Sequence, residues 1–421
     1  MICCGMVNRR KKMGMIKKTL FAGLFLCSAS ALGLSQAAGE EPIRIGVISS
    51  LSGPFAQLGE DSVDGVKIAL EEVGYQIGGR EIQLFIEDDG ADPSTAIEKA
   101  RALVNRDKVQ LILGPLSGSA GQAVKDSADE WPNTTIVVAG AAAEDITMRG
   151  IKPNVFRTSY TGAQPTFPLG DYAYKQGYRN VAIVAEDYAF PYAQVGGFMS
   201  TFCSLGGKVP KKFWVPIGTS DFSSIFPQLS GVDAVFVALG GTDAVNFIQQ
   251  MDGFGLIGKV KILGGTVTVD ATQLASVGEL LDGVVSASIM SGQIDTPAFK
   301  TLDEKFRSKR DRAPSLFTEN YYRAAKWSLL ALDNMGGKIE DQDTFRTKLQ
   351  QTSFAAPASW VSFDQYHNVV TDVYLNQVKN VDGEWLNVPI RTYSTVGQFW
   401  NFDPKEYQAA PSYNRDLPAC P

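Results

Sequence analysis

The feature that most constrains the fold is a repeated alternation of short apolar runs with segments of helical periodicity. Four strands are predicted in the first part of the chain, at Ile43–Ser49, Ile82–Ile86, Val109–Leu113 and Thr135–Ala139. Between the first two strands, apolar residues recur at helical spacing, at Val63, Val66, Leu70 and Val73. Strands that alternate with helices predict a parallel, doubly wound sheet and therefore an α/β fold.

A second alternating set begins after Phe156–Tyr160. Its strands are predicted at Val181–Ala185, Val209–Val215, Asp233–Leu239 and Val260–Leu263, and their nearly continuous apolar character is typical of strands covered on both faces. A strand near Gly283–Ser288 then leads into long helices at Pro297–Arg310 and Ser315–Met335, and a hairpin-rich tail begins at Trp360. Because no low-complexity linker separates the two sets, we expect two lobes with several chain crossings and a cleft.

Residues 1–38 differ from the rest of the chain. Six basic residues, Arg9, Arg10, Lys11, Lys12, Lys17 and Lys18, precede the apolar run Leu20–Leu34 and a small-residue end at Ser35–Ala38. This pattern predicts a secretory signal peptide that is cleaved near Ala37 or Ala38. A membrane anchor is disfavoured, because the apolar run is interrupted and shorter than the ~20 residues that span a bilayer.

Charge and cysteine content narrow the possible partners of the mature chain. The leader carries six of the 39 Lys and Arg residues, which leaves 33 basic against 45 acidic residues and a net charge near −12. A chain this acidic is a poor binder of nucleic acid.

Two cysteines remain after the leader, Cys203 and Cys420, and exported proteins commonly pair two cysteines. We expect a disulfide between them that ties the tail to a helix, although sequence alone does not give its geometry.

The stretch Leu111–Gly121 is the first candidate for a ligand-binding loop. An apolar strand ends there in Gly and Ser residues and leads into a helix, so backbone N–H groups are left free to hold an anion. The alternative is structural: Gly114 and Pro115 turn the chain, and Ser117 or Ser119 caps the helix. A second small-residue loop, Gly140–Ala143, follows the next strand. Ligands of parallel sheets bind beyond the carboxyl ends of the strands, where both loops fall, which favours binding.

A larger set of motifs resembles a known family. The set comprises Ile43–Val47, Leu51–Pro54, Gly59, Glu71–Val73, Gly78–Gly79, Asp88–Asp89, Asp92–Pro93, Gly114–Ser117 and Phe156–Arg157. Together these motifs resemble the type I periplasmic solute-binding proteins, and within them the leucine/isoleucine/valine-binding group of ABC importers. The resemblance implies two lobes joined by three hinge crossings, which close over a small ligand in the periplasm and deliver it to a membrane permease. It also implies a monomer.

The lobe boundaries follow from the same resemblance. The N-terminal lobe is expected to comprise residues 42–158 and 285–357. The C-terminal lobe is expected to comprise residues 159–284 together with 358–421, which include the tail.

The family's ligand-binding positions transfer only in part. In amino-acid-binding relatives, the loops that match Leu116–Ala120 and Ala141–Ala143 hold the ligand's α-carboxylate through backbone N–H groups and hydroxyls. Here Ser117 and Ser119 flank Gly118, but Ala143 stands where a Thr is expected. The acidic residue that pairs the ligand's ammonium aligns with Thr266. One Tyr of the relatives falls at Gly240 or Gly241, and another falls near Phe190.

These departures favour a ligand without an amine. A buried ammonium without a counter-charge costs several kcal/mol. We therefore expect an organic acid, with Phe55, Tyr160, Tyr188 and Phe190 as stacking faces for an aromatic ring. Core packing is the alternative for each of these aromatic residues, and Glu186 or Asp187 could replace the missing acid, which leaves amino-acid binding open. The predicted ligand-binding set is Phe55, Ser117, Gly118, Ser119, Ala141, Ala142, Ala143, Tyr160, Tyr188, Phe190, Gly240 and Thr266.

Three other patterns are interpreted as structural. Gly253–Gly258 matches a dinucleotide fingerprint but lies between a helix and a strand, so it indicates a helix end. The acids Glu87, Asp88, Asp89 and Asp92 lack the spacing of a calcium site and indicate a strand-end turn followed by a helix N-cap. His367, the only histidine, is expected on the surface.

Without a second histidine, Ser117 and Ser119 have no evident base. We therefore expect no catalytic residue, metal or cofactor and disfavour an exported enzyme. A ligand-sensing module for a membrane receptor stays open beside a transport role.

Overall fold

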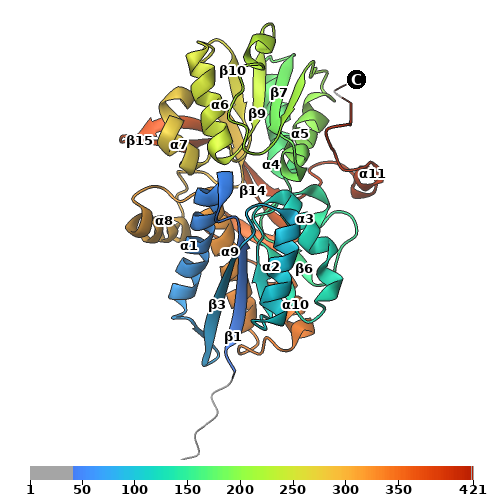
Figure 1. Ribbon diagram of the computed structural model, residues 1–421, viewed down its shortest axis with the longest axis vertical. Coiled ribbons are helices and arrows are strands. Elements are labelled where there is room, and N and C mark those ends of the chain that lie inside the picture. The colour runs from blue at the N-terminus through green and yellow to red at the C-terminus, as the bar shows by residue number, and fades with distance from the viewer. Residues whose placement is uncertain (1–40, 419, 421) are drawn as a thin grey trace, which may run out of the picture. The chain divides into compact units, whose positions relative to one another are not determined.

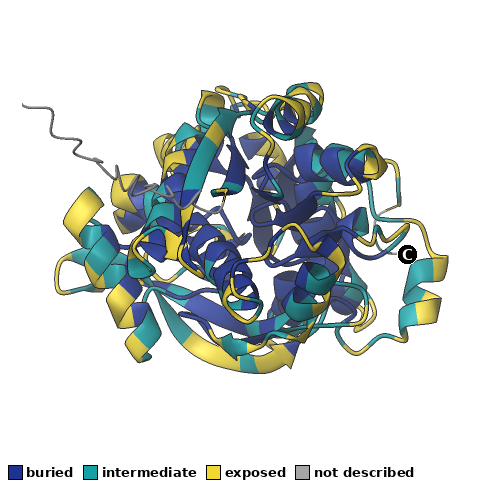
Figure 2. Cartoon of the chain, turned by 90° about the horizontal axis from the view of Figure 1, so that it is seen from below, coloured by how far each residue is buried: buried dark blue, intermediate teal, exposed yellow. Residues whose placement is uncertain are grey.

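The structure is a computed structural model that describes residues 41–418 and Cys420. The predicted signal peptide and its cleavage point near Ala37 or Ala38 lie outside these residues. The described residues form two sheets, each with helices on both faces, and each sheet with its helices makes one lobe (Figure 1). Buried residues gather on the strands and on the inner faces of the helices (Figure 2).

The first sheet has the strand order β2-β3-β1-β4-β5-β6. All of its pairings are parallel except that of β2 with β3. The strands are β1 (Ile43–Ser49), β2 (Gln76–Ile77), β3 (Arg80–Asp88), β4 (Leu111–Leu113), β5 (Thr135–Val138) and β6 (Val155–Arg157). The connecting helices are α1 (Ala56–Glu72), α2 (Pro93–Asn105) and α3 (Gly118–Asp126), with short 3₁₀ turns η1 (Gly53–Phe55), η2 (Ala128–Glu130) and η3 (Glu144–Ile146).

The second sheet has the order β12-β13-β14-β11-β10-β9-β7-β8, with β15 paired to β14. Its parallel strands are β7 (Val181–Glu186), β8 (Lys212–Val215), β9 (Ala234–Ala238), β10 (Lys261–Gly264) and β11 (Val285–Ser288). The antiparallel strands are β12 (Phe354–Ala355), β13 (Trp360–Phe363), β14 (Val369–Val381) and β15 (Glu384–Val396). The helices of this lobe are α4 (Ala163–Lys175), α5 (Ala189–Phe202), α6 (Gly241–Gly253) and α7 (Ala271–Val277), with η4 (Phe226–Leu229) and η5 (Gly278–Leu281).

Helices cover both faces of each sheet, as the apolar strands predict. In the first lobe, α1 packs in one cluster with β1, while α2 and α3 pack in another cluster with Ile48 and Ile112. In the second lobe, α6 and α7 share a cluster with Val235 and Val237, and α4 and α5 share one with Ile183. Strands buried on both faces have no polar face to show, which explains their continuous apolar runs.

Within the described residues the chain crosses between the lobes three times. It leaves the first lobe after β6 and returns after β11, and it leaves again before β12. The helices between the second and third crossings, α8 (Pro297–Arg310), α9 (Leu316–Asp333) and α10 (Gln342–Gln351), pack with the first lobe. The predicted boundaries at residues 284/285 and 357/358 both differ from this path. Strand β11 pairs with β10 and β14, and β12 pairs with β13, so both strands belong to the second sheet.

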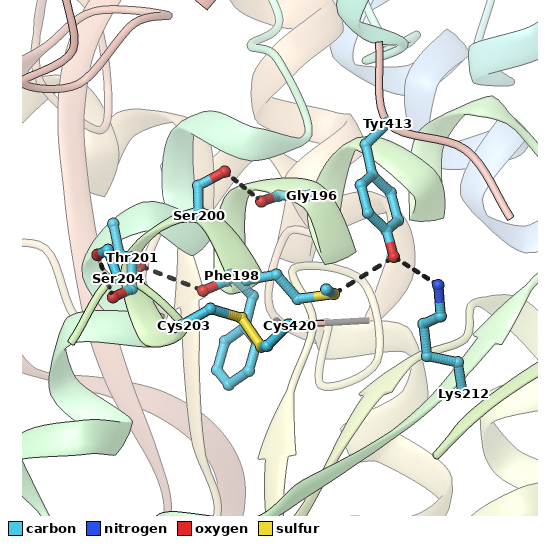
Figure 3. The surroundings of a disulfide bond; sticks show 10 residues. Gly196, Phe198, Ser200, Thr201, Cys203, Ser204, Lys212, Tyr413 and Cys420 are labelled. Carbon is cyan, nitrogen blue, oxygen red and sulfur yellow. Dashed lines mark hydrogen bonds between the residues drawn. A yellow bond between two sulfur atoms is a disulfide. The ribbon is translucent and has the colours of Figure 1, made fainter. Parts of the chain in front are cut away.

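The C-terminal tail returns along the second lobe and ends in α11 (Pro404–Ala409) and an extended segment. A disulfide joins Cys420 to Cys203, just after α5, with a Cα–Cα distance of 5.5 Å (Figure 3). Next to it, the Tyr413 hydroxyl accepts a hydrogen bond from Lys212 Nζ at 2.9 Å. A cavity of about 600 Å³, lined mainly by apolar side chains, lies between the tail and α5. None of the predicted ligand-binding residues lines this cavity.

Among the helices of the described part of the chain, none is both long and apolar enough to cross a membrane.

Candidate functional site

Seven of the twelve predicted ligand-binding residues follow the strands at which each sheet reverses its order, and the other five follow β5, β6 and β10. In the first sheet the reversal lies between β1 and β4, and in the second it lies between β7 and β9. Phe55 follows β1 and Ser117 follows β4, while Tyr188 follows β7 and Gly240 follows β9. These reversals are the positions where open α/β sheets bind ligands beyond the carboxyl ends of their strands.

The two sets of loops touch each other directly. The Ser119 hydroxyl accepts a hydrogen bond from the backbone N–H of Ala189 at 3.3 Å. A Cβ added at Gly118 would lie 2.9 Å from the Cβ and N of Phe190, and one added at Gly241 would lie 2.2 Å from the carbonyl oxygen of Pro54. Glycine is therefore needed on both sides of this contact, and the lobes are closed on one another.

On the first lobe, Ser117 occupies the N-cap position of α3. Its side chain makes no capping bond to that helix, and its hydroxyl is buried without a hydrogen-bond partner among the described residues. Ser117 therefore does not cap the helix through its side chain, whereas Gly114, with a φ of +116°, turns the chain as the structural alternative expected. The N-terminus of α3 thus combines a spare hydroxyl with the partial positive charge of a helix start, which suits a carboxylate.

The loop Ala141–Ala143 forms a fixed wall rather than a second set of hydroxyl donors. The Ala141 N–H donates to the carbonyl of Pro115 at 2.9 Å, and the Ala142 carbonyl accepts from the N–H of Gly162 at 2.8 Å. The Ala143 carbonyl accepts from the guanidinium of Arg157. Ala142 shares a cluster with Tyr160 and Phe190, whereas Ala141 and Ala143 pack in the cluster of α2 and α3. Of the three, only Ala142 is therefore grouped with the site's aromatic rings.

Four aromatic rings line up through the site. The ring centroids are 6.2 Å apart in each of the pairs Phe55–Tyr188, Tyr188–Phe190 and Phe190–Tyr160. Phe55, Tyr160 and Phe190 are buried, and Tyr188 is partly exposed. Phe55 comes from the first lobe and the other three follow the first crossing, so the row joins both lobes.

On the second lobe, buried polar groups surround Thr266. Gln194 of α5 donates from Nε2 to the Thr266 hydroxyl at 2.5 Å. Neither Gln194 Oε1 nor the Tyr160 hydroxyl has a hydrogen-bond partner within the part of the chain described. Burial is the main cause that raises the pKa of Tyr160, so its hydroxyl keeps its proton. A cavity of about 30 Å³, enough for water, adjoins Thr266 and Asp270.

Glu186 is the acidic residue of this site. It lies at the end of β7, fully buried, and its Oε1 accepts from the backbone N–H of Gly240 at 3.2 Å. Its Oε2 has no hydrogen-bond partner among residues 41–418 and Cys420. Burial is the largest cause that raises the pKa of Glu186 well above its ordinary value. Asp187, the other acid considered as a replacement, is instead bound by Tyr192 and by Arg415 of the tail.

Sequence reasoning missed Gln194 and a buried ion pair on α9. Arg323 Nη1 lies 3.4 Å from Glu319 Oε2, with both side chains fully buried, and Arg323 Nη2 donates to the Ser159 carbonyl at 3.3 Å. Burial lowers the pKa of Arg323 and raises that of Glu319. This pair therefore packs against the first crossing. The available signal was a lone Gln in the apolar α5 and an i,i+4 charge pair in the apolar α9.

The motifs interpreted as structural have these roles, with one exception. Helix α6 ends at Gly253, and Gly255 takes a φ of +66° before β10, which confirms the helix end. Asp92 caps α2 by accepting from the Thr95 N–H at 2.8 Å, which confirms the N-cap. No metal-holding group of His, Cys, Asp or Glu is found in the described residues.

The exception is His367, whose predicted surface position is wrong. It is half-buried, because its ring stacks on Phe156 at 4.2 Å and one ring nitrogen lies 3.0 Å from the carbonyl of Val155.

Comparisons with known proteins agree with this architecture. The sequence model of the family described as periplasmic binding protein matches residues 42–384. The Leu/Ile/Val-binding protein homolog 6 of Brucella melitensis biotype 1 is 26% identical over 391 residues, which cover 91% of this chain and 98% of the relative.

Two solved structures are similar along most of the chain. An ABC transporter substrate-binding protein from Sphaerobacter thermophilus has a TM-score of 0.78 and 30% identity, with 85% of this chain and 99% of that chain covered. A solute-binding protein of an ABC transporter from Rhodopseudomonas palustris BisB5, in complex with 3,4-dihydroxybenzoic acid, has a TM-score of 0.81 and 26% identity, with 85% and 98% covered.

The fold, the closed loops at the two strand-order reversals and the family match over residues 42–384 lead to one conclusion. The chain belongs to the periplasmic binding protein family, as a type I solute-binding protein of the Leu/Ile/Val-binding-like group of ABC transporters.

Proposed function

We propose that the protein binds one aromatic carboxylic acid without an α-amine between its lobes and delivers it to the permease of an ABC importer. The observation that carries the proposal is Ser117, whose buried hydroxyl lacks a partner among the described residues at the N-terminus of α3. A carboxylate there would accept from the hydroxyl and from the first N–H groups of the helix. We therefore assign the ligand's carboxylate to the N-terminus of helix α3.

The row of four rings supports an aromatic body for the ligand. Phe55, Tyr188, Phe190 and Tyr160 offer faces and edges at spacings that suit ring packing. The complex of the Rhodopseudomonas palustris relative with 3,4-dihydroxybenzoic acid supports the same class of ligand. Thr266, at the position where amino-acid-binding relatives carry an acid, offers only a hydroxyl that Gln194 already engages.

A branched-chain amino acid is the second candidate, and Glu186 favours it. If its free Oε2 ionised, this carboxyl could pair with an ammonium, and the Brucella relative is named as a Leu/Ile/Val-binding protein homolog. Burial opposes that ionisation by raising the pKa of Glu186, and the nearby Asp243 raises it further. The aromatic acid needs no such charge, so we rank it first.

The transport role follows from closure. Members of this family are transport components that work outside the cytoplasm and are not enzymes. A ligand that touches both lobes lowers the free energy of the closed state relative to the open one, and a permease can recognise that difference. We propose that this chain acts in the periplasm as a monomer.

Thermal unfolding of the mature chain, without residues 1–38, tests the proposal. The ligands are benzoate, 3,4-dihydroxybenzoate, hexanoate, 2-oxoisocaproate, benzamide and leucine. We expect the two benzoates to raise the Tm most, with about 2.7 kcal/mol of added stability at a ligand concentration of 100 Kd. A shift with leucine alone would make the amino-acid candidate correct and the aromatic-acid proposal wrong.

A further inference from the structure

We propose that Gln194, Glu186 and Tyr160 recognise a hydroxyl group at the end of the ligand opposite its carboxylate, so that the preferred ligand is a 4-hydroxylated aromatic acid. This inference rests on the proposed function, because it takes the carboxylate seat at Ser117 as given. What carries it is a group of polar atoms at the second-lobe end of the site. Each atom is fully buried, and none has a hydrogen-bond partner within the described chain.

Gln194 is fixed in place by Thr266. Its Nε2 donates to the Thr266 hydroxyl at 2.5 Å, which leaves Oε1 as a buried acceptor without a donor among the described residues. Gly265 leaves space for this oxygen, because a Cβ there would lie only 2.7 Å from it. A hydroxyl suits either orientation of the amide, because it both donates and accepts. A methyl group or a hydrogen on the ligand would satisfy neither.

Glu186 adds a second buried group with one free oxygen. Oε1 accepts from the Gly240 N–H, and Oε2 makes no hydrogen bond of good geometry in the described chain. The acidic group that faces it, Asp243 of α6, is itself held by the N–H groups of Gly218 and Thr219 at 2.7 and 3.2 Å. Burial, together with the charge of Asp243, raises the pKa of Glu186 and so favours its protonated form, which donates a hydrogen bond through its O–H. The Tyr188 hydroxyl also lies beside Glu186.

Tyr160 connects this end of the site to the row of rings. Its ring meets Phe190 edge to face, and its hydroxyl lies beside Thr266 without a hydrogen bond of good geometry to any described residue. The group therefore contains one acceptor, one protonated acid and one phenol. An alcohol or phenol can pair with members of both kinds. An ammonium only donates, so it could not accept from the protonated acid.

These polar groups are expected to discriminate between ligands with and without a hydroxyl group, rather than to raise the affinity for all of them. A site that is built to hydrogen-bond a hydroxyl rejects the analogue that lacks it, because the buried polar groups are then left unpaired. The comparison of ligands that differ only at the 4-position therefore isolates this end of the site. The carboxylate seat and the rings contribute equally to all of them.

The test is calorimetric titration of the mature protein with benzoate, 4-methylbenzoate and 4-hydroxybenzoate. We expect 4-hydroxybenzoate to bind at least tenfold more tightly than the other two. In Gln194→Met and Glu186→Leu this preference should fall below threefold. Glu186→Gln should keep the preference, since an amide still donates and accepts there. Gln122→Met, on the first-lobe helix α3 where Gln122 bonds to Asp126, is the matched control and should change nothing.

The outcomes separate the two proposals. If none of the three acids binds, the proposed function fails and this inference falls with it. If all three bind equally, or if the preference for 4-hydroxybenzoate survives in both Gln194→Met and Glu186→Leu, the aromatic-acid proposal stands and the inference is wrong. Each variant's Tm without ligand reports its folding. If one of the two does not fold, the other decides the outcome.

Discussion

Two of the contacts that hold the lobes together, one at the ligand loops and one at the C-terminal tail, are built differently. At the loops, Ser119 bonds to Ala189 across the gap, and several buried polar atoms have no partner among the described residues. At the tail, Arg149 of the first lobe donates to the carbonyls of Tyr407, Gln408 and Ala410 at 3.2, 3.1 and 2.7 Å. The tail is in turn fixed to the second lobe by the Cys203–Cys420 disulfide.

The difference indicates which of the two contacts changes when a ligand binds. Polar atoms left open at the loops can be satisfied by a ligand, so closure there depends on what is bound. The tail bonds are complete without a ligand, so they restrain the lobes whether or not the site is occupied in this closed arrangement. The tail also lies beyond residue 384, where the family match ends. Binding and restraint are therefore assigned to separate parts of the chain.

Loss of the disulfide tests the restraint and should have the largest effect. The bridge closes a loop with a sequence separation of 217 residues. In Cys203→Ser/Cys420→Ser we expect a loss of about 2–5 kcal/mol in the free energy of unfolding, with a correspondingly lower Tm. We also expect a larger radius of gyration by small-angle scattering without ligand, because the covalent link between the tail and the second lobe is lost and only non-covalent contacts such as that of Lys212 with Tyr413 remain.

Reductant provides the control for this prediction. It should lower the Tm of the wild type towards that of the double variant and leave the double variant unchanged. If the wild type and the double variant were equally stable without reductant, the tail would not restrain the lobes.

A charge at Gly118 tests the ligand contact itself. Gly118→Asp places a carboxylate at the proposed anion seat and a Cβ 2.9 Å from Phe190, so we expect at least a 100-fold loss of affinity for benzoates, about 2.7 kcal/mol. Gly118→Ala separates the two causes, because it adds the Cβ without the charge. Gly253→Asp is the matched control, since nothing lies within 4 Å of a Cβ there. Unchanged binding by Gly118→Asp would place the ligand's acid group elsewhere.

Arg149 tests the tail contact with the disulfide intact. Arg149→Ala removes three hydrogen bonds to tail carbonyls and the ion pair with Asp145, so we expect a loss of about 1–3 kcal/mol in denaturant unfolding. Arg101, which pairs with Glu130 at the surface, is the control, and Arg101→Ala should cost less than about 1 kcal/mol. Similar losses in the two variants would mean that the tail bonds add no stability beyond a surface pair.

Much of the fold was predictable because its signals are local. Strand β1 and helix α8 have the predicted limits, since the apolar run at Ile43–Ser49 and the Thr296 cap followed by Pro297 mark them within a few residues. The lobe assignment of β11 was not predictable, because its partners β10 and β14 are chosen by tertiary packing. The burial of His367 likewise depends on Phe156, more than 200 residues earlier.

The candidate site also has a part that local sequence signals predict and a part that they do not. The loops after β1, β4, β7 and β9 could be located from the order of strands and helices. The bond from Gln194 to Thr266 spans 72 residues and that from Gly240 to Glu186 spans 54, and no local pattern encodes either. The polar end of the site therefore emerged only from the structure.

The smallest predicted effect is the pH dependence that Glu186 contributes to stability. Its pKa is raised in the folded protein, chiefly by burial, so the folded state holds this proton to higher pH than the unfolded state does. The contribution is fully present below the ordinary glutamate pKa of about 4.3 and is lost as the pH rises from there through the raised folded value. Relative to Glu186→Gln, which carries no titrating group, the wild type should lose stability steadily above about pH 4. Denaturant unfolding of both proteins between pH 4 and 8 measures the difference, and Glu98→Gln serves as the control for loss of an acid elsewhere. A constant difference across this range would mean that Glu186 is ionised in the closed protein, and the ammonium-binding alternative would then gain over the hydroxyl.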